Sequence, residues 1–269
     1  MKKIFAKPVA VIAFFEFYEN IRNKWLFIYA FSFLIFSGII THIGAGDPLQ
    51  ASASLLNLVL LLVPLFSLVF GSLSFSESLP FHEILVSLPI SRRDIFFGKW
   101  IGLGTGLSIS FLFGMGVGSL LQMNIAESGF GSYGLLLLLG ILLTFVFLSL
   151  SFFVVNWVRK KELIFGWILL LWFFFFILYD VLIMGVVLFF GNYPLEIPML
   201  ALTFLNPIDL ARVVLLLKID LSAMMGYSGA LFQKYLGNAA GLFIGSGALA
   251  LWIVIPGWLS LRSFEKKDL

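Results

Sequence analysis

Few side chains in this sequence are of the types that catalyse reactions. There is no cysteine, and the only histidines are His42 and His82. One carboxylate, Asp180, stands alone within the apolar stretch 163–190. An intramembrane protease or lipid transferase would need paired carboxylates, a histidine cluster or an activated nucleophile. We therefore expect no catalytic residue and no enzyme activity in this chain.

The sequence also lacks a motif for binding ATP. Its Gly-Lys pair, Gly98 and Lys99, is followed by Trp100 and lacks the earlier glycine of GxxxxGK[ST], the loop whose backbone amides bind phosphates. We expect no cofactor in this chain, so that ATP and magnesium, if they are used, bind a partner ATPase. Nothing in the sequence indicates a nucleic-acid partner.

Methionine is the remaining candidate for metal binding, because thioethers are suitable ligands for Cu(I). Adjacent methionines project in different directions on a helix, and the two histidines are expected on opposite sides of the membrane. Methionine in apolar segments usually serves packing. We therefore expect no metal site from the four methionines that could face outward, Met123, Met199, Met224 and Met225.

Composition identifies an integral membrane protein. Hydrophobic residues make up 61% of the 269 residues and charged residues 12%, whereas soluble domains carry about 25% charged residues. The length allows about six spanning helices of about 20 residues. We expect one all-α membrane domain and no cleaved signal peptide, because Glu16 and Glu19 interrupt the first apolar stretch. The expected spans are residues 25–43, 55–75, 101–121, 134–157, 163–190 and 239–261.

Residues 1–24 precede the first span and predict an amphipathic helix in the cytoplasmic interface. Phe14, Phe17 and Tyr18 share one helical face, and Glu16 and Asn20 lie opposite. The alternative is that these residues are the polar beginning of the first span.

Glycine recurs every fourth residue in and just before the third span, at Gly98, Gly102 and Gly106 and again at Gly114 and Gly118. This spacing predicts close packing of that helix against protein.

Residues 76–100 form the most polar loop in the first half of the chain. Pro80 and Pro89 bracket about two turns of helix, after which Ser91 and Asp94 have capping-box spacing. So short a helix needs something to dock against. It either inserts into a cytosolic subunit or rests on lipid by its apolar face, Phe81, Ile84, Leu85 and Leu88, with His82, Glu83 and Ser87 pointing elsewhere.

The loop 191–238 is expected on the outer side. Asn206, Pro207 and Asp209 have the types and spacing of N-cap, N1 and N3 of a helix to about Leu217, too short to cross a bilayer. We expect helices lying on or near the outer membrane face. Asp180, whose burial in lipid costs about 2.5–3.5 kcal/mol, has either a coupling role or a structural hydrogen bond near that face.

Charge placement predicts orientation. Of the 17 Lys and Arg residues, 14 lie on one side of the expected spans, and the other three lie in the loop 191–238. The positive-inside rule then places both termini, including the tail 262–269, in the cytoplasm.

Three segments resemble type-2 ABC transporter permeases (ABC-2 family), and more closely the NosY subgroup of nitrous oxide reductase maturation. They are LVSLPISRRDIFFGKW at 85–100, LLLWFFFFILYDVLIMG at 169–185 and LNPIDLARVVLLLKIDLSAMMGYSGALF at 205–232. The resemblance implies a type V exporter fold with an N-terminal elbow helix, a cytoplasmic coupling helix and a helical re-entry before the last span. It implies a bacterial inner-membrane location.

The same resemblance implies a permease homodimer, two copies of a cytosolic ATPase like NosF and a periplasmic β-helical partner like NosD that handles copper. Other readings are an ABC-2 exporter of another substrate and a membrane scaffold that does not transport. The implied ATPase-coupling residues are Glu77, Phe81, Glu83, Ile84, Leu85, Leu88, Arg92 and Arg93, and the implied outer coupling residues are Tyr179, Asp180, Asn206, Asp209 and Arg212.

Overall fold

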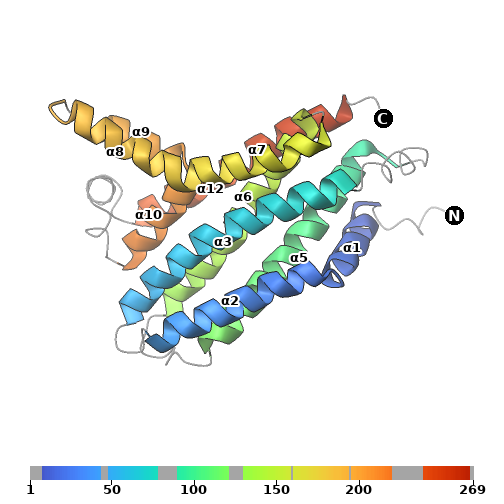
Figure 1. The fold of residues 1–269 in the computed structure, drawn as a ribbon, viewed down its shortest axis with the longest axis horizontal. Coiled ribbons are helices and arrows are strands. Elements are labelled where there is room, and N and C mark those ends of the chain that lie inside the picture. The colour runs from blue at the N-terminus through green and yellow to red at the C-terminus, as the bar shows by residue number, and fades with distance from the viewer. Residues whose placement is uncertain are drawn as a thin grey trace.

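The computed structural model describes residues 8–43, 48–77, 90–120, 130–158, 160–193, 195–219 and 239–266. Across these ranges every regular element is a helix. Six helical runs are long and apolar enough to cross a membrane, which confirms the predicted all-α fold with six spans. Figure 1 shows the long helices side by side, with the two ends of the chain at the same end of the bundle.

The helices follow one another in the order that we predicted from the apolar segments of the sequence. Helices α7, η1 and α8 together form one candidate span of 30 residues. The elements are α1 (Pro8–Ile21), α2 (Lys24–Ile43), α3 (Pro48–Glu77), α5 (Arg92–Leu120), α6 (Phe130–Trp157), α7 (Lys161–Phe173), the π-helix η1 (Phe174–Leu178), α8 (Tyr179–Phe190), α9 (Glu196–Phe204), α10 (Pro207–Ile219) and α12 (Ala239–Glu265).

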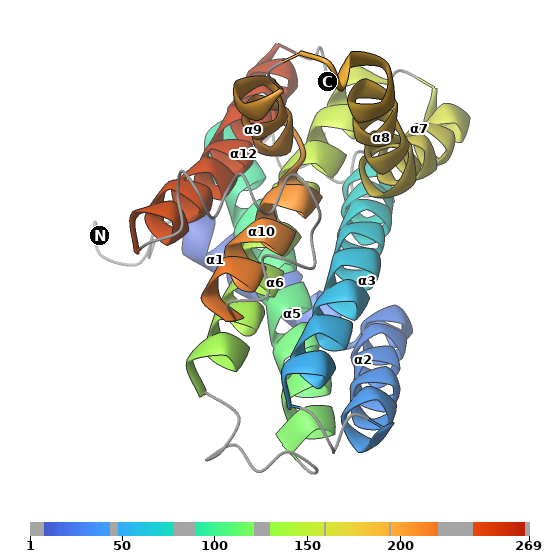
Figure 2. The same cartoon turned by 90° about the vertical axis from the view of Figure 1, so that its left-hand side faces the viewer.

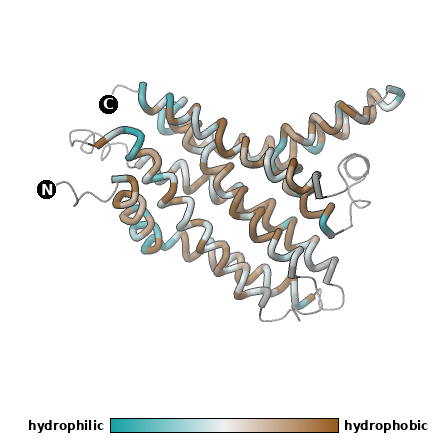
Figure 3. The backbone as a smooth tube through the Cα atoms, turned by 180° about the vertical axis from the view of Figure 1, so that it is seen from behind, coloured by the Kyte–Doolittle hydropathy of each residue, from teal (hydrophilic) through white to brown (hydrophobic). Residues whose placement is uncertain are grey.

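Helix α6 is the most buried of the candidate spans and packs against α3, α5 and α12. The spans α2, α7–α8 and α12 are mostly exposed, as expected of helices that face lipid or another subunit. Hydrophobic residues run along the middle of the long helices, and hydrophilic residues gather near the end that carries both termini (Figure 3). This distribution matches the bilayer, which excludes charge from its centre.

The glycines of α5 allow α1 and α2 to approach closely, as their spacing predicted. A Cβ atom on Gly98 would lie 2.7 Å from Ile12 of α1, and one on Gly102 would lie 2.6 Å from the Ala13 carbonyl oxygen. Further along, Gly114 contacts the backbone of Ala30 in α2. The partners of this small-residue stripe therefore belong to the same chain.

Helix α1 is amphipathic, but its polar face points into the bundle. Glu16 and Asn20 are buried, whereas Phe14 and Tyr18 are exposed. The polar face packs on α5, where Lys99 supplies a countercharge. Lys99, which the sequence analysis counted among the charges on the cytoplasmic side, lies buried within α5.

Helices α9 and α10 meet at an angle of 110°. The sequence analysis expected helices on or near the outer face, but α10 packs inside the bundle against α12, α6 and α3. Its residues Ile208, Leu210 and Val214 are completely buried. Figure 2 shows α10 between α3 and α12, in front of α6.

Candidate functional site

The five residues predicted to act near the outer side come together in space. Tyr179 and Asp180 begin α8, Asn206 occupies the corner between α9 and α10, and Asp209 and Arg212 lie on the first turns of α10. Although 32 positions separate Asp180 from Arg212, their side chains contact each other. We refer to these five residues as the corner cluster.

Asn206 is the central residue of the corner cluster and is fully buried. Its Oδ1 accepts a hydrogen bond from the Ile208 amide at 2.9 Å, which confirms the predicted N-cap of α10. Its Nδ2 donates to the Phe175 carbonyl at 3.0 Å and to Asp209 Oδ2 at 2.9 Å. One amide side chain thus joins α10 to the fifth span.

The Phe175 carbonyl belongs to the π-helix Phe174–Leu178, which interrupts the span between α7 and α8. A π-helix bonds i to i+5, is rare, and often occurs at functional sites. Asn206 donates to this segment from outside the span. The irregular turn is therefore fixed by the corner between α9 and α10.

The charges of the cluster form a chain from α10 to α8. Arg212 Nη1 donates to Asp209 Oδ1 at 2.9 Å and reaches Asp180 Oδ2 at 3.5 Å. The Asp209 side chain is only 8% exposed, and that of Asp180 is 47% exposed. The inner contact is therefore the stronger of the two, because solvent weakens ion pairs at exposed positions.

Two further side chains hold the end of α9. Tyr179 Oη donates to the Leu202 carbonyl at 2.5 Å, and Trp252 Nε1 of α12 donates to the Phe204 carbonyl at 3.0 Å. The Trp252 ring also meets the Phe175 ring edge-on at 5.7 Å. Both bonds go to carbonyls in the last turn of α9, where intrahelical donors run out. Sequence reasoning missed Trp252, since a tryptophan within a span has no distinguishing pattern.

Of the residues implied to couple to the ATPase, the structure describes only some. Phe81, Glu83, Ile84, Leu85 and Leu88 lie outside the described residues. Glu77 ends α3, and Arg92 and Arg93 begin α5.

The beginning of α5 is joined to the end of α12. Arg92 Nη1 donates to the Glu265 carbonyl at 3.0 Å, and Arg93 Nε pairs with Glu265 Oε1 at 2.6 Å. Ser91 Oγ accepts from the Asp94 amide at 3.1 Å, which confirms the predicted cap. Beneath these contacts four phenylalanine rings from four helices pack together, at Phe75, Phe96, Phe152 and Phe264.

A buried ion pair joins α1 to α5 near the same end. Lys99 Nζ lies 3.1 Å from Glu16 Oε1 and 3.2 Å from Oε2. Burial raises the pKa of Glu16 above its ordinary value, and the Lys99 ammonium opposes that rise. The sequence analysis placed both residues but did not pair them, because they lie 83 positions apart.

The chemistry of the corner cluster is that of a structural joint. Its acidic side chains contact Arg212, and the cluster holds no nucleophile activated by a base. Within the described ranges no group of three or more His, Asp or Glu residues is placed to hold a metal ion. The bonds of the cluster that cross between elements join α10 to α8, α8 to α9, and the corner residue Asn206 to the π-helix.

Comparison with known proteins identifies relatives over nearly the whole chain. The family model for ABC-2 family transporter proteins matches residues 58–269. The chain is 29% identical over 261 residues to the "Probable ABC transporter permease protein NosY" of Pseudomonas aeruginosa strain PAO1, covering 91% of this chain and 93% of the relative. It is 28% identical over 263 residues to the protein of the same description from Stutzerimonas stutzeri, with 91% of each covered.

The matched region contains both ends of the bundle described above. It includes the end of α3, the Arg92 contacts with α12 and the complete corner cluster. Together with six membrane-length helices, this match shows that the chain belongs to the ABC-2 family of transporter proteins and is a multi-pass ABC transporter permease.

Proposed function

We propose that this permease passes ATP-driven movement of a cytosolic ATPase from one side of the membrane to a partner on the other. The chain receives the movement at the segment 81–88 and delivers it at the corner cluster. The observation that supports this proposal is that α12 contacts the beginning of α5, which follows segment 81–88 in the sequence, and the end of α9, which adjoins the corner cluster. Arg92 bonds the carbonyl of Glu265 near the end of α12, and Trp252 bonds the α9 carbonyl at Phe204.

Helix α12 is suited to carry a displacement over this distance. Trp252 precedes Glu265 by 13 residues, which is about 20 Å at the rise of an α-helix. Further along, Gly245 lies directly against Val214 of α10. Closely packed helices move as rigid bodies rather than deform continuously. A push on the beginning of α5 would therefore shift α12, and with it the corner between α9 and α10.

We further propose that the permease acts in copper-site maturation of nitrous oxide reductase, as a homodimer with two NosF-like ATPases and a periplasmic NosD-like protein. The relatives named NosY support this assignment. The proposed location is the bacterial inner membrane with both termini in the cytoplasm. The six candidate spans and the two chain ends at one end of the bundle support placing both termini on one side of the membrane (Figure 1). The distribution of Lys and Arg supports the cytoplasmic side.

Docking of the ATPase is tested by Leu85→Asp in a pull-down from membranes that contain the proposed NosF-like ATPase. Leu85→Asp is expected to remove most of the ATPase and leave the permease in the membrane, because it puts a charge on the proposed docking face. Ser87→Asp adds the same charge to the other face of the predicted helix and serves as control. Full recovery of the ATPase with Leu85→Asp would refute the docking assignment.

Transmission along α12 is tested by Trp252→Phe in the purified complex. This change keeps an aromatic ring but removes the donor to the Phe204 carbonyl. Binding of the ATPase in the purified complex should persist, while maturation of the reductase in cells falls. Stimulation of ATPase activity by the periplasmic partner separates a working transporter from a passive scaffold, because a scaffold would show only the basal rate.

A further inference from the structure

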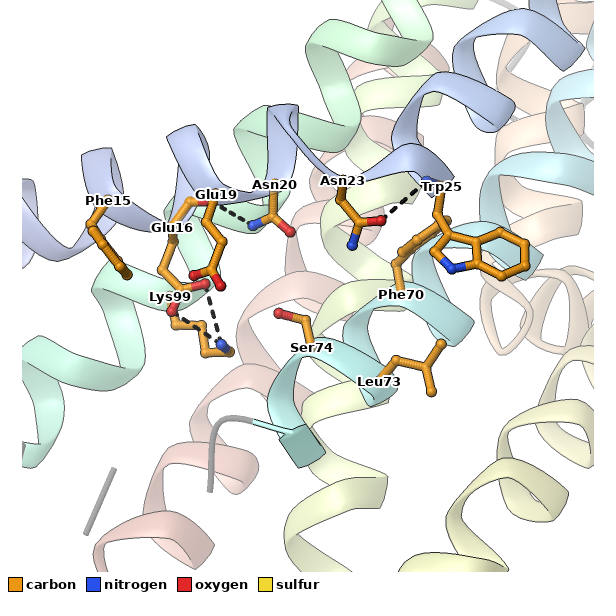
Figure 4. Close-up of a pocket in the computed structure, with 10 residues that line it drawn as sticks. All are labelled: Phe15, Glu16, Glu19, Asn20, Asn23, Trp25, Phe70, Leu73, Ser74 and Lys99. Carbon is orange, nitrogen blue, oxygen red and sulfur yellow. Dashed lines mark hydrogen bonds and ion pairs between the residues drawn. The ribbon is translucent and has the colours of Figure 1, made fainter. Parts of the chain in front are cut away.

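A cavity of about 530 Å³ lies beside the buried ion pair and is unrelated to the corner cluster. Side chains from four helices line it, and Figure 4 shows them pointing toward a common space. Helix α1 contributes Glu16 and Glu19, and α5 contributes Lys99. The remaining wall comes from Trp25 of α2 and from Phe70 and Ser74 of α3.

The cavity lies where the headgroups of one leaflet are expected. Trp25 follows the first residue of a candidate span, and Ser74 is two residues from the end of another. Lys99 is seven residues into a third candidate span, which is about 10 Å along its axis. Tryptophan is enriched at this depth of a membrane. Three spans therefore contribute to the cavity from the same end.

The charges around the cavity favour a ligand that carries a cation. Lys99 neutralises one carboxylate, Glu16, at 3.1 Å. Figure 4 places the Glu19 carboxylate next to this pair, and Glu19 is exposed at the rim. The lining thus carries one excess negative charge beside aromatic side chains, Phe15 and Trp25. Carboxylates and aromatic faces both attract an ammonium ion, and only the carboxylate favours an ammonium with N–H donors over a quaternary one.

We propose that this cavity binds the headgroup of a phospholipid with a primary ammonium, phosphatidylethanolamine, from the adjoining leaflet. The ammonium bonds Glu19, and the phosphate lies on the side of Lys99. A primary ammonium has three donors for carboxylate oxygens. The trimethylammonium of phosphatidylcholine has none, and the anionic phosphatidylglycerol is repelled. The volume lies within the range of about 300–1,000 Å³ that is typical of small-ligand sites.

Such a lipid would hold α1 against the bundle. Its headgroup would touch α1, α2, α3 and α5 at once, on the inward polar face of α1. The outward face of α1 is apolar, with Phe14 and Tyr18 exposed. Helix α1 would then lie between lipid acyl chains on its outward face and a bound headgroup on its inward face.

Native mass spectrometry of the full chain tests this proposal without the ATPase. The permease is incubated with an equimolar mixture of phosphatidylethanolamine, phosphatidylcholine and phosphatidylglycerol that have identical acyl chains. The wild type is expected to retain phosphatidylethanolamine preferentially. Glu19→Gln should reduce that preference about fivefold, the weight of one charge-assisted hydrogen bond at a partly exposed site.

The matched control is Glu162→Gln, which removes an exposed carboxylate on α7 away from the cavity and should leave lipid retention unchanged. Ser74→Phe, which fills the cavity from α3 without changing charge, should abolish the preference. Equal retention of the three lipids by the wild type would overturn the proposal, as would equal behaviour of Glu19→Gln and Glu162→Gln. Displacement of the lipid by millimolar free ethanolamine would assign the site to a soluble amine instead.

Discussion

Replacement of Asn206 by alanine tests whether one amide fixes the corner between α9 and α10. The change removes the N-cap bond to Ile208, worth about 1 kcal/mol. It also removes the donors to the Phe175 carbonyl and to Asp209. A neutral hydrogen bond contributes about 1 kcal/mol and one to a charged group about 1.5–3 kcal/mol, whereas bonds between membrane helices average about 0.6 kcal/mol.

These contributions overlap, so we expect a net loss of about 3 kcal/mol. For a chain of this size the loss lowers the melting temperature by roughly 6–12 °C. The assay measures the folded fraction of purified permease by size-exclusion chromatography after heating in detergent. Asn206→Asp keeps the cap oxygen but replaces both donors with a second carboxylate beside Asp209, and it should be at least as harmful.

Asn23→Ala is the matched control, because Asn23 also caps a helix but is exposed. Its Oδ1 accepts from the Trp25 amide at 3.1 Å, and it makes no bond of this kind to another span. We expect a loss of no more than about 1 kcal/mol. Equal melting temperatures for Asn206→Ala and Asn23→Ala would refute the reasoning that Asn206 joins α10 to the fifth span.

Three further substitutions have defined outcomes. Gly102→Val forces its side chain against α1 and should lower the yield of folded permease in size-exclusion chromatography, whereas Gly116→Val, with open space around its Cβ, should not. Lys99→Met leaves Glu16 buried without its countercharge and should destabilise the protein by about 3–5 kcal/mol. Burial and the neighbouring Glu19 carboxylate then raise the pKa of Glu16 without opposition from Lys99. The ionised form is penalised, so thermal stability of this variant should recover as pH falls. Asp180→Asn should change the free energy of unfolding by less than about 1 kcal/mol, since the Asp180 side chain in its pair with Arg212 is half exposed. It should nevertheless impair reductase maturation in cells. Normal maturation would favour a purely structural role.

Features that depend on neighbouring residues were accessible from the sequence. Hydropathy located the apolar runs, and capping patterns located the beginnings of α5 at Ser91 and of α10 at Asn206. The glycine spacing predicted that α5 packs closely against protein, and Gly98 and Gly102 do so against α1. Each of these signals lies within a few residues along the chain and follows from local geometry.

Features that depend on which helices are neighbours were not accessible. With 61% hydrophobic residues, most helices are apolar on every face, so periodicity does not indicate which face is buried. The inward turn of the polar face of α1 follows from Lys99, which lies on another helix. The insertion of α10, the π-helix at Phe174–Leu178 and the contact of Arg92 with α12 likewise depend on distant segments.

The Glu16–Lys99 pair also constrains the order in which the protein is made. Helix α1 leaves the ribosome before α5, and the cation that neutralises its buried carboxylate is synthesised 83 residues later. Until the third span is inserted, Glu16 must remain in water, because an unpaired charge is costly in lipid. Ribosome-bound chains that stop before Lys99 should therefore leave α1 open to protease, and longer ones should protect it. Helix α1 would therefore dock onto the bundle only after α5, a segment translated later, has been inserted.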